Sequence, residues 1–262
     1  MNYYLGTMGF SYKDWLGVFY PEGQSSRDYL SYYSRIFNAV EIDSTFYGTP
    51  RAETVARWSA LTPDDFQFCL KTPRLITYDL SLEGAAGLMT EFVQAVAELG
   101  DKLGVILIQF PPSFAADRMA DLEAFLKEVP AGVRYAVEVR HRSWYTARES
   151  MTEMLARPGV CWASTQYPGL PRRLNLTAPF VYLRWIGQHG SYENHTHERV
   201  DRTADLQGWL DLIRVAEPGL EALYGFMNND YAGFGAGTAN RFKELAGLPV
   251  KPLQPPQQGR LL

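Results

Sequence analysis

The strongest constraint on this chain is a repeated alternation of short β-branched or aromatic runs with amphipathic stretches. Eight runs typical of strands lie at residues 3–10, 39–43, 66–71, 104–110, 133–139, 159–164, 180–185 and 222–228. Helical patterns lie between most of them, at 25–37, 53–60, 85–98, 119–127, 148–156, 204–215 and 238–246. Strands that alternate with helices pair in parallel through right-handed crossovers. The pattern predicts an α/β fold, a single TIM-type (β/α)8 barrel, with a doubly wound open sheet as the alternative.

The domain organisation follows from the same pattern. Only the stretch STQYPGLPRRLNLTAP, between the sixth and seventh runs, lacks a helical pattern. No linker or change of composition interrupts residues 1–250, so we expect one barrel domain over that range. The segment 251–262, KPLQPPQQGRLL, is rich in Pro and Gln and cannot continue a helix, so we expect a separate C-terminal tail on the surface.

Composition excludes several classes of protein. With 25 Lys and Arg against 29 Asp and Glu, the chain has no overall basic field to attract nucleic acid or an anionic membrane. No run of 18 uncharged apolar residues and no signal peptide is present, so we expect a cytoplasmic protein without a membrane partner. The only cysteines, Cys69 and Cys161, lie in apolar stretches and suit buried thiols in a reducing compartment.

Charged residues interrupt two of the most apolar strand candidates. In a barrel strand, alternate side chains face the interior and the surrounding helices. In YAVEVR (135–140), the apolar Tyr135, Val137 and Val139 face the helices. The alternate residues Glu138 and Arg140 therefore face inward. The same sorting of AVEID turns Glu41 and Asp43 inward, again late in the strand. Both strands therefore predict charge at the carboxyl end of the barrel.

Other strand candidates end in polar groups as well. These are Lys71, Gln109, Arg184, and the run Asn228, Asn229 and Asp230. The carboxyl ends of the strands carry the active site in barrels of this class. A buried ion network without function is the alternative, since three acidic and three basic side chains can neutralise one another. Such a network costs several kcal/mol per ion in desolvation, which favours a functional site.

These residues suggest an enzyme that binds a small, polar, anionic substrate. A phosphorylated compound is one candidate for that substrate. Glu41 and Glu138 are the candidate catalytic acid and base. The predicted substrate-binding residues are Asp43, Lys71, Gln109, Arg140, Trp144, Arg184, Asn228, Asn229 and Asp230. The class of reaction, whether hydrolase, lyase or isomerase, stays open. Nucleic-acid binding or processing, as in endonuclease-type barrels, and a non-catalytic ligand-binding module are the alternatives.

No cofactor is predicted, because no GxxxxGK[ST] or GxGxxG motif is present. A divalent metal is the less favoured alternative, either on His195 and His197 in the segment 187–200 or on the oxygens of the acidic residues. The Gly-bearing loop NNDYAGFGAGTAN leads into a helix and offers backbone amides to a phosphate. The aromatic residues of SYKDWLGVFYP are expected to wall the barrel top, with Trp144 the expected ligand contact.

The chain resembles the YecE-like proteins, grouped as domain of unknown function 72. The resemblance rests on GTMGFSYKDWLGVFYP, FNAVEIDSTFYGTP, LGDKLGVILIQFPPSF, YAVEVRHRSW, YLRW and FMNND, which extend over almost the whole length. It implies a TIM-like fold and carries no agreed reaction. The sequence departs from the family pattern at Met8, where Ser is usual, at Asp43, where Asn is usual, and after Arg184, where YLRWIG replaces Arg-x-His-Gly. The end of the sixth run, WASTQ, also lacks an expected Asp.

Overall fold

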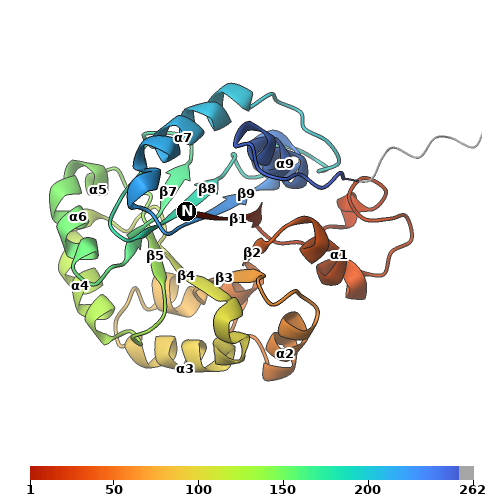
Figure 1. Cartoon of the computed structure of the whole chain (residues 1–262). Helices are drawn as coiled ribbons and strands as arrows, with labels where there is room; N and C mark the ends of the chain where they lie inside the picture. The colour runs from red at the N-terminus through yellow and green to blue at the C-terminus, as the bar shows by residue number, and fades with distance from the viewer. Residues whose placement is uncertain (254–262) are drawn as a thin grey trace, which may run out of the picture.

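Parallel strands form the centre of the protein, and helices surround them (Figure 1). This computed structural model describes residues 1–253. The strands are β1 (Asn2–Thr7), β2 (Ala39–Ile42), β3 (Gln67–Lys71), β4 (Leu103–Gln109), β5 (Tyr135–Glu138), β6 (Cys161–Trp162), β7 (Ser164–Gln166), β8 (Phe180–Trp185) and β9 (Ala222–Met227). The predicted α/β fold with parallel pairing is therefore confirmed.

The longer helices fall where the amphipathic patterns predict them. They are α1 (Tyr29–Ile36), α2 (Ala52–Ala60), α3 (Ala86–Val96), α4 (Met119–Glu128), α6 (Arg148–Ala156), α7 (Thr203–Ala216) and α9 (Gly235–Leu245). Two four-residue helices, α5 (Ser143–Thr146) and α8 (Asn229–Ala232), were not predicted. The remaining short turns are η1 (Lys13–Trp15), η2 (Ser26–Asp28), η3 (Ser44–Tyr47), η4 (Leu75–Asp79), η5 (Ala97–Lys102), η6 (Ala116–Arg118) and η7 (Glu217–Gly219). The stretch between β7 and β8 contains no helix, as expected.

The strands belong to two parallel sheets, in the orders β1-β9-β8-β7 and β2-β3-β4-β5-β6. The sixth predicted strand, 159–164, is instead 161–166 and is divided at Ala163. Its first part, β6, pairs with β5, and its second part, β7, pairs with β8, so one continuous segment passes from one sheet to the other. Ala163 keeps contact with the first sheet, because its amide donates to the carbonyl oxygen of Val137 at 2.9 Å.

The alternation of side chains along the strands divides the apolar residues into two cores. The larger core lies between strands and helices and includes Val40, Ile42 and Val137. The smaller one lies on the opposite side of the strands and is made of Met8, Ala39, Cys69, Val105, Leu107, Ala136, Cys161, Ala163, Phe180, Tyr182, Ala222, Tyr224 and Phe226. The predicted sorting of inward and outward positions in β2 and β5 is confirmed. Both cysteines are buried and free.

At the junction of β1 and β2, side chains take the place of a regular backbone ladder. The amide of Thr7 donates to the hydroxyl of Tyr33 at 2.8 Å, and that hydroxyl donates to the carbonyl oxygen of Ala39 at 3.1 Å. The side chain of Asn38 accepts from the amide of Leu5 at 2.9 Å and donates to the carbonyl of Tyr3 at 2.8 Å. These bonds satisfy the amides of Leu5 and Thr7 and the carbonyl of Tyr3 on the edge of β1 that faces β2.

The junction is closed further along by backbone contacts. Met8 and Glu41 form an isolated parallel bridge, and the amide of Gly9 donates to the carbonyl of Glu41 at 2.7 Å. Gly6 permits the close approach, since a Cβ at this position would lie 1.9 Å from the carbonyl oxygen of Ala39. The two sheets therefore meet here as well as at Ala163.

The predicted tail begins within the described residues. Asn240 on α9 donates to the carbonyl of Lys251 at 3.0 Å, and the Lys251 ammonium donates to the carbonyl of Arg35 on α1. The rest of the predicted tail, 254–262, lies outside the described residues. Over residues 1–253, no helix combines the length and apolar character needed to cross a membrane.

Replacing Tyr33 with Phe tests the role of its hydroxyl. The change leaves the Thr7 amide and the Ala39 carbonyl without this partner in a buried position, which should cost about 1–3 kcal/mol of unfolding free energy. Urea denaturation measures the loss. Tyr32→Phe, on the same helix, is the control, and equal small losses for both variants would contradict the proposed bridging role.

Candidate functional site

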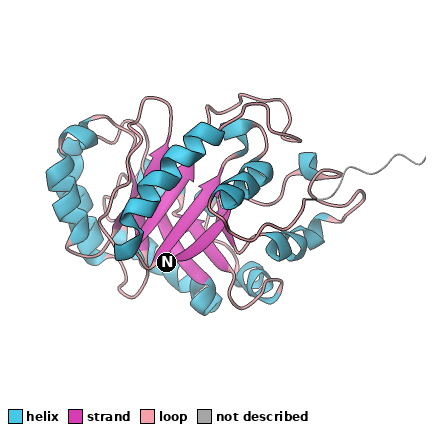
Figure 2. Ribbon diagram, turned by 45° about the horizontal axis from the view of Figure 1, so that its top comes forward, coloured by secondary structure: helices cyan, strands magenta, loops and turns pink. Residues whose placement is uncertain are grey.

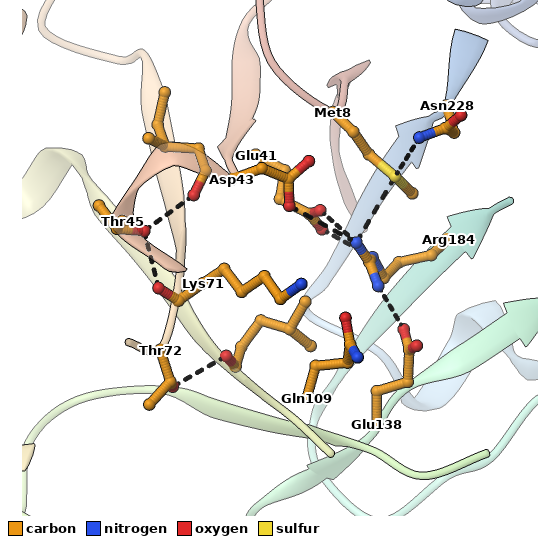
Figure 3. Close-up of polar contacts among 12 residues, drawn as sticks. Met8, Glu41, Asp43, Thr45, Lys71, Thr72, Gln109, Glu138, Arg184 and Asn228 are labelled. Atoms are coloured by element: carbon orange, nitrogen blue, oxygen red, sulfur yellow. Dashed lines mark hydrogen bonds and ion pairs between the residues drawn. The ribbon is translucent and has the colours of Figure 1, made fainter. Parts of the chain in front are cut away.

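Three buried side chains from three strands meet at the carboxyl end of the strands (Figure 3). Glu41 comes from β2, Glu138 from β5 and Arg184 from β8. Each occupies an inward position of its strand, next to the smaller core. Their exposures are 0%, 0% and 3%, so water does not solvate them as it does surface ions. The structure brings these three predicted residues together.

Arg184 lies between the two carboxylates and binds both. Its Nη2 contacts Oε1 of Glu41 at 2.6 Å, and its Nε donates to Oε2 of the same carboxylate at 3.0 Å. Its Nη1 donates to Oε2 of Glu138 at 2.7 Å. Tyr182, two residues earlier on β8, donates its hydroxyl to Oε2 of Glu41 at 2.6 Å. Arg184 therefore forms a bidentate pair with one carboxylate and a single bond with the other.

The two carboxylates differ in protonation because their cationic partners differ. Burial raises the pKa of Glu41 to about 7. The positive charge of Arg184 offsets only part of this rise, and the negative charge of Asp43 adds to it. Burial also acts to raise the pKa of Glu138, but Arg184 and Arg140 outweigh it and lower the pKa to about 2. Glu138 is thus held as an anion, whereas Glu41 titrates near neutral pH.

Lys71 extends from the end of β3 toward this network, and its ammonium has no hydrogen-bond or ion-pair partner among the described residues (Figure 3). Its nitrogen lies 3.9 Å from the ring centroid of Phe46. Burial lowers the pKa of Lys71 to about 8, with a further lowering by Arg184 that nearby carboxylates offset only in part. Lys71 is therefore a partly buried amine with free donors and a sizeable neutral fraction near neutral pH.

Arg140 follows β5 and is more accessible than Arg184. Its Nε donates to Oε1 of Glu138 at 2.8 Å, and its guanidinium lies 4.7 Å from the ring centroid of Tyr167. Its side chain is 16% exposed. Asp43, with a side chain that is 39% exposed, lies 3.8 Å from Nη2 of Arg184. We call Glu41, Asp43, Lys71, Glu138, Arg140 and Arg184 the charged cluster.

Gln109 ends β4, directly beside Glu138 in the strand register. Its Nε2 donates to the hydroxyl of Tyr78 at 2.7 Å and to the carbonyl of Phe110 at 3.1 Å. The ring of Tyr78 packs against that of Phe46, with centroids 5.1 Å apart. The structure thus links Gln109 to the surroundings of Lys71 through two aromatic residues.

The segment after β9 forms a neighbouring polar group. Asn228 accepts from the Asp230 amide at 2.8 Å and donates weakly to Sδ of Met8 at 3.6 Å. The Asp230 carboxylate lies 3.4 Å from both His189 and His195. Among residues 1–253, no group of three or more His, Cys, Asp or Glu converges to hold a metal ion.

Two predicted binding residues lie elsewhere. Trp144 is fully buried, and its indole N–H donates to the carbonyl of Phe114 at 2.7 Å, so the expected ligand contact is corrected to a packing role on α5. Asn229 is 4% exposed and accepts from the Gly235 amide at 2.9 Å, so it fastens the start of α9. Both follow a strand end, but each bonds to a group outside the charged cluster.

The start of α9 has protein partners of its own. Asn229 uses the first amide, and Glu198 accepts from the hydroxyl of Thr238 at 3.0 Å and pairs with Arg241. Glu198, from the segment after β8, therefore bonds to two side chains of this helix.

Several members of the site were not predicted. Tyr182 could have been found, because it shares the inward parity of Arg184 in FVYLRW. Phe46, Tyr78 and Tyr167 lie in segments after strands, where no periodic pattern indicates which way a side chain points. Their positions depend on the loop conformations.

Comparison with known proteins places the chain in a family. The family described as "Protein of unknown function DUF72" matches residues 4–260. The chain belongs to this family. It is 34% identical over 214 residues to the UPF0759 protein YecE of Escherichia coli K12, covering 73% of this chain and 76% of that protein. The resemblance noted in the sequence is thereby confirmed.

Solved structures of the same family agree with the fold. A DUF72 protein from Thermotoga maritima has a TM-score of 0.81 and 30% identity, and the alignment covers 94% of this chain and all of that one. A DUF72 protein from Enterococcus faecalis, at 21% identity, has a TM-score of 0.77 over 97% of this chain and 99% of that one, which shows the fold alone. None of these names states a substrate or a reaction.

The unequal carboxylates predict opposite dependences of stability on pH. Glu41, with a pKa above its usual 4.5, retains a proton that the unfolded chain releases, so its contribution to stability falls as pH rises from about 4.5 to about 7. Glu41→Gln removes this titrating group. The change in unfolding free energy between pH 5 and pH 8 should therefore be smaller in the variant, by about 3 kcal/mol at most. Urea unfolding of both proteins at the two pH values measures it.

Glu138→Gln is the matched comparison. Glu138 has a pKa below its usual value, so its contribution is present above about pH 4.5 and is lost as pH falls toward 2. This variant should lose part of the acid sensitivity and keep the change between pH 5 and pH 8. Identical pH profiles for the two Gln variants would rule out the assignment of the titrating proton to Glu41.

Proposed function

We propose that the two sheets form one closed (β/α)8 barrel and that the chain is an enzyme for a small, polar, anionic substrate bound at the carboxyl ends of its strands. Closure is supported by the two junctions between the sheets, one at Ala163 and one where Tyr33 and Asn38 bridge β1 and β2. The separate inner core agrees with it, because a barrel interior is filled by inward side chains.

The observation that carries the functional proposal is the pair of cations with unused donors, Lys71 and Arg140, in front of a saturated ion network. Lys71 has no protein acceptor among the described residues, and Arg140 uses only its Nε on Glu138. Lys71 ends β3 and Arg140 follows β5, on either side of the strand that ends in Gln109. An ammonium and a guanidinium with unused donors suit a carboxylate or phosphate ligand.

The roles of the acidic residues differ from each other in this proposal. Glu138 is anionic and bonded to two arginines, so it positions Arg140. Glu41 is the carboxylate with a pKa near neutrality, about 7, which suits general acid or base chemistry. Because both Glu41 oxygens are bonded and its exposure is 0%, Lys71 is the titratable group that meets the substrate, and Glu41, which titrates near neutral pH, lies behind it.

A thermal-shift screen tests the binding proposal. Organic acids, phosphorylated sugars, nucleotides, short oligonucleotides and divalent metals are compared on the wild type. A small anion at a hundred times its dissociation constant contributes about 2.7 kcal/mol, a rise of several degrees in Tm. Lys71→Met and Arg140→Met should each abolish that rise.

Lys127→Met and Arg157→Met are the controls. They remove the same residue types from exposed positions beside the amino end of β5, with side chains 70% and 69% exposed. Both should respond as wild type. Equal responses of all four variants would place the ligand elsewhere, and a shift by oligonucleotides alone would favour nucleic-acid binding.

A further inference from the structure

The protein contains two largely buried lysines that end in contrasting surroundings. The ammonium of Lys102 donates to the carbonyls of Ser59 and Thr62 at 2.7 and 2.8 Å, and Asp64 lies 3.8 Å away. The ammonium of Lys71 has neither a carbonyl nor a carboxylate within bonding distance among the described residues. Buried ammonium groups are normally paired as Lys102 is. Lys71 is the exception that needs an explanation.

The surroundings of Lys71 favour its neutral form. Burial removes part of its hydration and the Arg184 guanidinium adds a like charge, whereas the ring of Phe46 at 3.9 Å favours the ammonium form. With a pKa of about 8, its free-amine fraction at pH 7 is on the order of a hundred times that of a lysine with the usual pKa. A neutral amine is a nucleophile toward carbonyl carbon, and desolvated or cation-flanked lysines serve this purpose in enzymes.

We propose that Lys71 forms a Schiff base with a carbonyl compound that carries a carboxylate or phosphate group, with Arg140 binding the anionic end. The proposal rests on the proposed function and names its substrate class. Arg140 is suited to this part because Glu138 and the face of Tyr167 fix the guanidinium while part of it stays accessible. The aldehyde or ketone carbon would then lie beside the free amine.

The step is a condensation without a change of oxidation state. The Lys71 nitrogen bonds to the carbonyl carbon, the C=O bond breaks, and the oxygen leaves as water with the two amine hydrogens. A further proton converts the imine to its cationic form. The carboxylates that face Lys71, which are Asp43, Glu41 and Glu138, favour this positive charge, just as they raise the pKa of the amine. The cation then stabilises a carbanion at the adjacent carbon, which suits lyase or isomerase chemistry.

Reductive trapping tests the proposal on the full chain. Pyruvate and glycolaldehyde phosphate are the anionic probes, acetone is the neutral probe, and sodium cyanoborohydride reduces any imine to a stable amine. Intact mass and peptide mapping then locate the adduct. We expect one adduct at Lys71 with an anionic probe, at least about tenfold faster than at any other lysine, since its free-amine fraction is far larger. Arg140→Met should slow this labelling, and acetone should label weakly.

Lys243 is the internal control. Its pKa is also lowered, by burial and then by Lys251, and its nitrogen lies 5.8 Å from the ring of Phe37, but it is on α9 away from the charged cluster. Labelling of Lys243 or Lys127 as fast as Lys71 would overturn the inference, as would no adduct with either probe. Mapping on the wild type needs no variant, so an unstable mutant does not obscure the result. Lys71→Arg, which keeps the charge, should remove the adduct.

The two proposals fail separately. If anions still raise Tm in a manner that needs Arg140, but nothing is trapped at Lys71, the binding function stands and the Schiff base is wrong. If no anion raises Tm and no adduct forms, both are wrong. A Lys71 adduct formed equally well with acetone and in Arg140→Met would contradict the anionic substrate class.

Discussion

The charged cluster depends on one buried guanidinium. Arg184 extends from β8, in one sheet, and binds Glu41 and Glu138, which come from β2 and β5 of the other. It therefore links the two sheets as well as neutralising charge. The strands of these sheets lie at the centre of the molecule, with helices around them (Figure 2). A buried network of this kind stabilises a fold less than well-packed apolar residues of similar volume often would. Its cost is easier to understand if the arrangement serves a ligand, because charges held in fixed positions bind another charge without reorganisation.

The arrangement also makes two identical carboxyl groups unequal. Glu138 contacts two guanidinium groups and is ionised, whereas Glu41 shares one guanidinium, accepts from Tyr182 and lies near Asp43. Burial alone would raise the pKa of both. The number of cationic partners decides the outcome, and it moves the two pKa values apart, which is how enzymes assign acid and base roles to like residues.

Much of this could be predicted from the sequence, because a strand repeats every two residues. That period places Glu41, Glu138 and Arg184 inward, and it would also have placed Tyr182. Segments after strands have no such period, so the orientations of Trp144 and Phe46 depend on contacts formed only in the folded chain. Helices as short as α5 and α8 contain too few residues to reveal a helical period.

The unpaired state of Lys71 follows from competition among the cations. A guanidinium presents donors in a planar fork that matches a carboxylate, whereas an ammonium is a point charge that is more costly to dehydrate. Arg184 and Arg140 therefore bind the oxygens of Glu41 and Glu138, and the remaining acid, Asp43, is partly solvated. The amine is left beside the aromatic ring of Phe46. Saturation of the network behind Lys71 is thus the reason that its donors, and near neutral pH its lone pair, are available in front.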